Sequence, residues 1–237
     1  MPSAVHYLPI LTTALSVLFA ASLYRRWALK RAPHLWWWAV GITTYGLGTA
    51  IESAITLGGN SVVLTKAWYI AGALLGGYPL AQGSLYLSWP RALANRLTVI
   101  TVSFVAIASV LVILSPVNFA ALEPHRPSGA ILEWRWVRLL TPFINLYAVF
   151  FLIGGALRSA WRHYRYRGHS YRAAGNGLIA LGAILPGIGG SLAKAGMVEA
   201  LYVGECIGLI VIWTGDRVCA RQEAPAPAGP VSVAPAS

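Results

Sequence analysis

Two glutamates stand inside long apolar stretches of the sequence, and they have the clearest potential for chemistry. Glu52 lies in an apolar stretch over residues 34–57, and Glu205 lies in another over residues 198–214. A carboxylate near the centre of a membrane-spanning helix costs about 2.5–3.5 kcal/mol to insert, so such residues usually face the bundle interior or a water-filled cavity. The alternative for each is a neutral, hydrogen-bonded acid that serves only packing.

The two carboxylates are expected at the same depth. At 1.5 Å per helical residue, both lie roughly 8–10 Å below the outer surface, and two carboxylates in one low-dielectric site should not both ionise. We therefore predict one polar ligand-binding pocket in the outer half of a helix bundle, with Gln82 at its floor. Hydrogen bonding between helices is the alternative for its uncharged members. The predicted ligand-binding residues are Glu52, Glu205, Tyr45, Tyr78, Gln82 and Tyr202.

The elements that must position these residues are membrane-spanning helices. Of the 237 residues, 57% are hydrophobic and only 11% are charged, whereas soluble domains carry about 25% charged residues. The sequence predicts an all-α membrane protein, a bundle of seven transmembrane helices within residues 1–221, and a disordered Pro/Ala-rich tail over residues 222–237. The predicted spans are residues 8–23, 34–57, 67–87, 97–114, 136–157, 173–193 and 198–214.

Lysine and arginine are distributed unequally between the two ends of these spans. Thirteen lie in the first, third and fifth connections and the tail, and five lie in the other connections. Because basic residues accumulate on the cytoplasmic side of a membrane, we expect the N-terminus outside and the C-terminus in the cytoplasm.

The fifth connection holds the densest basic run. Its place beside the cytoplasmic leaflet favours anionic lipid headgroups as the partner, at about 1 kcal/mol per basic residue, over nucleic acid. Docking of a cytoplasmic protein is the alternative. The predicted headgroup-binding residues are Arg158, Arg162, Arg165, Arg167 and Arg172.

Known catalytic and cofactor patterns are missing from the sequence. It contains no HExxH or GxSxG motif, and none of its five histidines lies in the apolar interior of a predicted span. We predict no catalytic residue, no metal site and no cofactor, and an enzyme is the less favoured class. A retinal Schiff base would need a lysine in the middle of the last span, whereas Lys194 precedes that span.

One region resembles a known family. A Trp-led stretch reaches "AIE" through several glycines and is followed by "TKAWYIAG" and "YPLAQGSLYL". Over Trp36–Tyr86 this pattern resembles the seven-helix membrane region at the N-terminus of many bacterial sensor histidine kinases. The resemblance implies a sensory module in the cytoplasmic (inner) membrane of a bacterium. Only a short tail follows Asp216, so we expect any output to pass through a separate signalling protein.

The sequence therefore favours a receptor-like membrane sensor that binds a ligand from the outer side or from the bilayer. Two other functions stay open. The carboxylates could couple protons in a small transporter or lipid-handling protein, and the chain could be an accessory subunit of another membrane protein. The ligand and the oligomeric state do not follow from the sequence.

Overall fold

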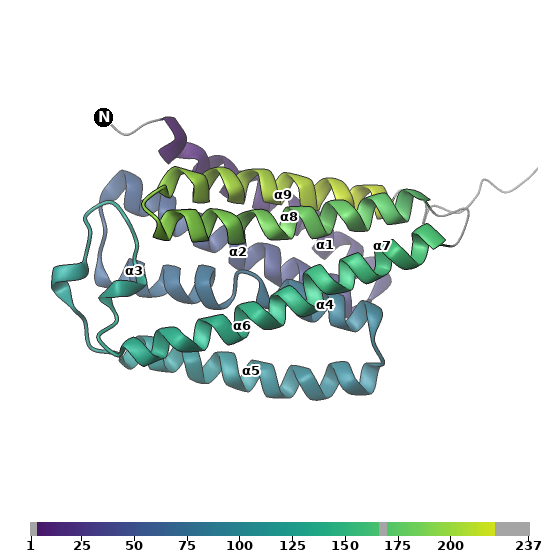
Figure 1. Cartoon of the computed structure of the whole chain (residues 1–237), viewed down its shortest axis with the longest axis horizontal. Helices are drawn as coiled ribbons and strands as arrows, with labels where there is room; N and C mark the ends of the chain where they lie inside the picture. Colours follow the sequence, from purple (N-terminus) through teal and green to yellow (C-terminus); the bar gives the residue numbers. More distant parts are fainter. Residues whose placement is uncertain (1–3, 166–169, 221–237) are drawn as a thin grey trace, which may run out of the picture.

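The computed structural model describes residues 4–165 and 170–220, and the predicted tail over residues 222–237 lies outside them. The described residues form helices that group into seven roughly parallel rods (Figure 1). The third rod is built from α3, η2 and α4, and the fifth from η5, α6, η6 and α7. In chain order the helices are η1 (Ala4–Tyr7), α1 (Leu8–Lys30), α2 (Pro33–Gly58), α3 (Val62–Trp68), η2 (Tyr69–Leu74), α4 (Tyr78–Ser88), α5 (Arg91–Leu114), η3 (Phe119–Ala121), η4 (Gly129–Ile131), η5 (Arg135–Leu139), α6 (Leu140–Ala148), η6 (Val149–Gly154), α7 (Gly155–Arg165), α8 (Ser170–Lys194) and α9 (Val198–Ala220).

The predicted all-helical class is confirmed, and five helical segments are long and apolar enough to cross a membrane. They are Val5–Lys30, Arg91–Leu114, Arg135–Arg165, Tyr171–Ala193 and Val198–Ala220. The α2 helix has 26 residues, but its tryptophans, glycines, threonines and one glutamate lower its hydropathy. The third rod is interrupted, so neither of its α-helices reaches the length of a span.

The third rod breaks next to two glycines. Its middle segment, η2, is a π-helix, and residues 75–77 then form a turn and a bend before α4 begins, with Leu75 and Gly77 still in the right-handed helical region. Thr44 in α2 donates a hydrogen bond of 3.2 Å to the freed carbonyl of Leu75. A proline within a predicted span is expected to kink a continuous helix. In the structure Pro79 lies in the first turn of α4, where a backbone N–H would make no hydrogen bond within the helix.

Helices α8 and α9 pack through glycine at seven-residue spacing. A Cβ atom added at Gly182 would lie 2.6 Å from the carbonyl oxygen of Gly208, and one at Gly175 would lie 2.9 Å from that of Gly215. Only glycine permits so close an approach of two backbones. The pair lies side by side along its whole length (Figure 1).

A buried ion pair joins the first and last helices, α1 and α9. It lies at the end of the molecule opposite residues 115–134, the connection between α5 and η5 that the predicted orientation makes an outer loop. Nη1 of Arg26 in α1 lies 2.8 and 2.6 Å from the two carboxylate oxygens of Asp216 in α9. The Asp216 side chain is 4% exposed and that of Arg26 is 22% exposed. The pair satisfies two charges that the apolar bundle could not otherwise hold.

Candidate functional site

The two predicted carboxylates come together between α2 and α9. Glu52 is only 2% exposed, and its Oε1 accepts a hydrogen bond of 2.7 Å from the indole Nε1 of Trp68. Tyr45, two helical turns away on α2, donates a hydrogen bond of 2.9 Å from its hydroxyl to the backbone carbonyl of Glu205. The carboxyl groups of Glu52 and Glu205 lie within hydrogen-bonding reach of each other.

One oxygen on each carboxyl group is left without a donor. Oε2 of Glu52 and Oε2 of Glu205 are both buried, and neither accepts a hydrogen bond from another described residue. Buried acceptors are almost always satisfied in folded proteins. The donor at this place is a proton that the two carboxyl groups share, a water molecule in the cavity, or a group that a ligand supplies.

The carboxyl pair lines a cavity of about 810 Å³ that extends from the middle of the bundle to the outer loop. Four of the six predicted ligand-binding residues line it: Glu52, Glu205, Tyr45 and Tyr202. Both π-helical segments, η2 and η6, contribute wall residues. Such segments inside α-helical rods are frequent at functional sites.

Tyr78 and Gln82 belong to a different polar network. Gln82 is fully buried, donates from Nε2 to Thr98 over 2.5 Å and accepts from the Tyr147 hydroxyl over 2.6 Å. The hydroxyl of Tyr78 bonds to that of Thr101 over 2.9 Å. These contacts tie α4 to α5 and α6, and neither residue lines the cavity.

The placement of Gln82 at the floor of the pocket is therefore wrong. The inner end of the cavity is lined by apolar side chains that belong to the main hydrophobic cluster between α1, α2, α4, η6 and α9. These side chains are Ile42, Leu80, Leu152 and Leu209.

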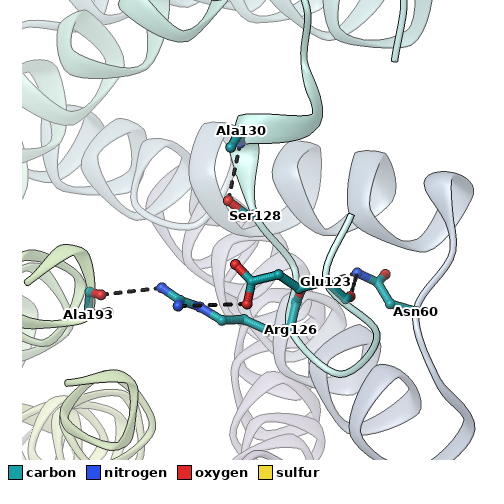
Figure 2. A network of polar contacts seen from close by, with 6 residues as sticks. All are labelled: Asn60, Glu123, Arg126, Ser128, Ala130 and Ala193. Carbon is teal, nitrogen blue, oxygen red and sulfur yellow. Dashed lines mark hydrogen bonds and ion pairs between the residues drawn. The ribbon is translucent and has the colours of Figure 1, made fainter. Parts of the chain in front are cut away.

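The mouth of the cavity is shaped by the connection between α5 and η5, here called the outer loop (residues 115–134). Figure 2 shows how it is held: the Asn60 amide donates to the backbone carbonyls of Glu123 and Arg126, over 2.8 and 3.0 Å. Arg126, which lines the cavity, donates to the carbonyl of Ala193 over 3.3 Å and lies 3.9 Å from the Glu123 carboxylate. The loop thus links the α2–α3 turn to the end of α8.

Replacing Asn60 with alanine should loosen the outer loop. The change removes both side-chain donors to the loop and the acceptor that Thr65 uses at 2.7 Å. At about 0.5–1.5 kcal/mol for each net hydrogen bond, amide exchange over residues 119–131 should accelerate about tenfold or more, as measured by hydrogen exchange with mass spectrometry. Asn118→Ala is the matched control, because the Asn118 side chain accepts only from Ala120 within the loop. Equal acceleration in both variants would show that Asn60 does not anchor the loop.

Four of the five predicted headgroup-binding arginines lie in α7 and at the start of α8, at the end of the bundle remote from the outer loop. Arg158 stacks over Trp89 and Arg165 over Trp161, with 5.5 and 5.0 Å between the guanidinium carbon and the ring centre. Arg172 lies 6.0 Å over Tyr171 and Arg162 is exposed. Arg167 lies outside the described residues.

Two contributors to the site were absent from the sequence-based prediction. Trp68 and Arg126 line the cavity but are not among the predicted residues, because their contacts with Glu52 and Ala193, 16 and 67 positions away, cannot be read from the local sequence. Within residues 4–165 and 170–220, no three His, Cys, Asp or Glu side chains form a group that could hold a metal ion.

Comparison of the chain with protein-family models, with curated proteins and with solved structures found no match. The resemblance to sensor kinase membrane regions therefore stays a hypothesis, and a function must be argued from the cavity itself.

Proposed function

We propose that the protein is a seven-span membrane receptor that binds a small ligand in the cavity and passes the signal to a separate protein. The observation that carries this proposal is a cavity that reaches the outer loop and has two buried, unsatisfied carboxyl oxygens on residues of its wall. Its volume falls within the roughly 300–1,000 Å³ of small-molecule sites. The inner end of the cavity is apolar, which supports a ligand that enters and leaves only at the outer loop, as a receptor requires.

The proposed topology has seven spans, with the N-terminus outside and the C-terminus in the cytoplasm. The α2 helix and the third rod run beside the five apolar helices, which supports counting them as spans (Figure 1). Arginines stacked on tryptophans at one end of the bundle, as at Arg31 and Arg158, suit an interface with anionic lipid headgroups on the cytoplasmic side.

A small transporter is the second candidate, and the break in the third rod favours it. Gly76 and Gly77 line the cavity at the point where the third rod is interrupted. Interrupted helices at a central site are a feature of secondary transporters. Proteoliposomes that contain a pH-sensitive dye distinguish the two. A proton flux above the leak of empty liposomes that Glu52→Gln abolishes would favour transport.

Cysteine labelling in intact cells tests the topology and the open cavity, in a background with Cys206→Ala and Cys219→Ala. With a membrane-impermeant thiol reagent, we expect rapid labelling of Phe119→Cys, which is 71% exposed in the outer loop. Thr49→Cys, buried on the cavity wall, should label about tenfold or more slowly because the reagent must enter the cavity.

Val17→Cys serves as the control, because Val17 is 63% exposed on the apolar surface of α1 and should face lipid. Labelling of Phe119→Cys only after lysis would reverse the orientation. A Thr49→Cys variant as unreactive as Val17→Cys would contradict entry from the outer side.

A further inference from the structure

We propose that the cavity binds an organic cation, a protonated primary amine on an apolar body, with its ammonium group between the carboxyl groups of Glu52 and Glu205. This inference rests on the proposed function, since it names the class of ligand for the same cavity. It is carried by the two unsatisfied acceptors, the aromatic rings around them and the apolar remainder of the wall.

The acceptors define what the ligand must offer. Two carboxyl oxygens, Oε2 of Glu52 and Oε2 of Glu205, are buried without a donor at one place in the wall. An ammonium group carries three N–H donors and one positive charge in a compact volume. It can donate to both oxygens at once and offset the negative charge of the pair once at least one carboxyl group is ionised, whereas a carboxylate or phosphate has no N–H donor to offer.

Aromatic rings surround the carboxyl pair. Trp68 bonds to Glu52, Tyr45 bonds to the Glu205 backbone, and Tyr202 lies close enough to interact electrostatically with both carboxylates. All three rings line the cavity. The faces of such rings attract cations by about 0.5–2 kcal/mol, and together with two carboxylates they form a setting that selects positive charge.

Three arginines also line the cavity, and one of them, Arg126, interacts electrostatically with Tyr202. Arg126, at the mouth, lies against the Glu123 carboxylate and donates to the Ala193 carbonyl. Arg135 and Arg138 line the part of the cavity beside η5. The wall beyond the carboxyl pair is apolar, with Leu152 and Leu209 among its residues, so it suits a hydrocarbon body rather than a hydrated metal ion.

Equilibrium dialysis on full-length protein in phosphatidylcholine nanodiscs tests this assignment, with empty nanodiscs to correct for partition into lipid. The probes are hexylamine, hexan-1-ol and hexanoate, which share one apolar body and differ in the head group. We expect hexylamine to bind at least about tenfold more tightly than the other two, because charge-assisted hydrogen bonds are stronger than neutral ones.

Glu52→Gln and Glu205→Gln should each weaken hexylamine binding about tenfold or more and leave hexanol binding unchanged. Hexanol thus reports that each variant keeps a folded cavity. Glu199→Gln is the matched control, since Glu199 is exposed in the first turn of the same helix and its loss should not matter.

The outcomes separate this inference from the proposed function. Equal binding of hexylamine and hexanol, or tighter binding of hexanoate, would overturn the amine assignment and leave the cavity as a ligand site. Hexylamine binding that survives both glutamine substitutions would overturn it too. If none of the three probes binds and Thr49→Cys is also unreactive, then the ligand-binding function itself fails.

Discussion

Replacing Gly182 with leucine should prevent α8 from packing on α9 and leave little folded protein. Even the first carbon of a side chain at this position would lie 2.6 Å from the Gly208 carbonyl oxygen and 2.8 Å from Ile212. Both neighbours include backbone atoms, so the helices must separate. Overpacking by an alanine alone should cost about 1–3 kcal/mol, and leucine should cost more because the whole interface opens.

The measurement is the yield of monodisperse protein in mild detergent together with the melting temperature. Gly177→Leu is the matched control, because a Cβ atom at Gly177 on the same helix meets nothing within 4 Å. Gly182→Ala should fall between the wild type and Gly182→Leu. Wild-type stability of Gly182→Leu would mean that the two helices are farther apart than the structure places them.

Replacing Asp216 with leucine should destabilise the protein by about 3–5 kcal/mol, because it leaves the Arg26 guanidinium largely buried without its partner. The expected result is a clear fall in melting temperature and in resistance to denaturant. Arg217→Leu is the control, since Arg217 is the next residue of α9 but is exposed, and its loss should change stability little.

The double variant Arg26→Met/Asp216→Leu should recover most of the lost stability, because apolar residues of similar volume can replace a buried ion pair at little cost. If the double variant is as unstable as Asp216→Leu, then α1 and α9 depend on something other than this pair. If neither single change matters, then the two side chains do not meet in the folded protein.

Much of the helical arrangement could be predicted from the apolar stretches, and the differences lie at the ends. The predicted last span ends at residue 214, whereas the helix that contains it, α9, continues to Ala220. Asp216 lies in this extension, where its charge is paired with Arg26 of α1, 190 residues away.

The candidate site could be predicted only in part. The sequence predicts one pocket for Glu52 and Glu205 from their distances along two helices, and both residues line the same cavity in the structure. The side of the third rod on which Gln82 lies could not be predicted by counting helical turns from Trp68. A π-helix and a break lie between Trp68 and Gln82, and each changes which face of the rod points toward the cavity. Periodicity holds only along an unbroken helix.

The same break divides the third rod into two mechanically separate halves. The inner half, α4, is fixed by Gln82 to α5 and α6, while the outer half holds Glu52 through Trp68. A continuous helix carries a tilt along its whole length, but a rod with residues 75–77 outside the helix absorbs the tilt at that point. We therefore expect a displacement of Trp68 to move α3 relative to α4, and to reach the outer loop through the turn at Asn60 rather than through α4.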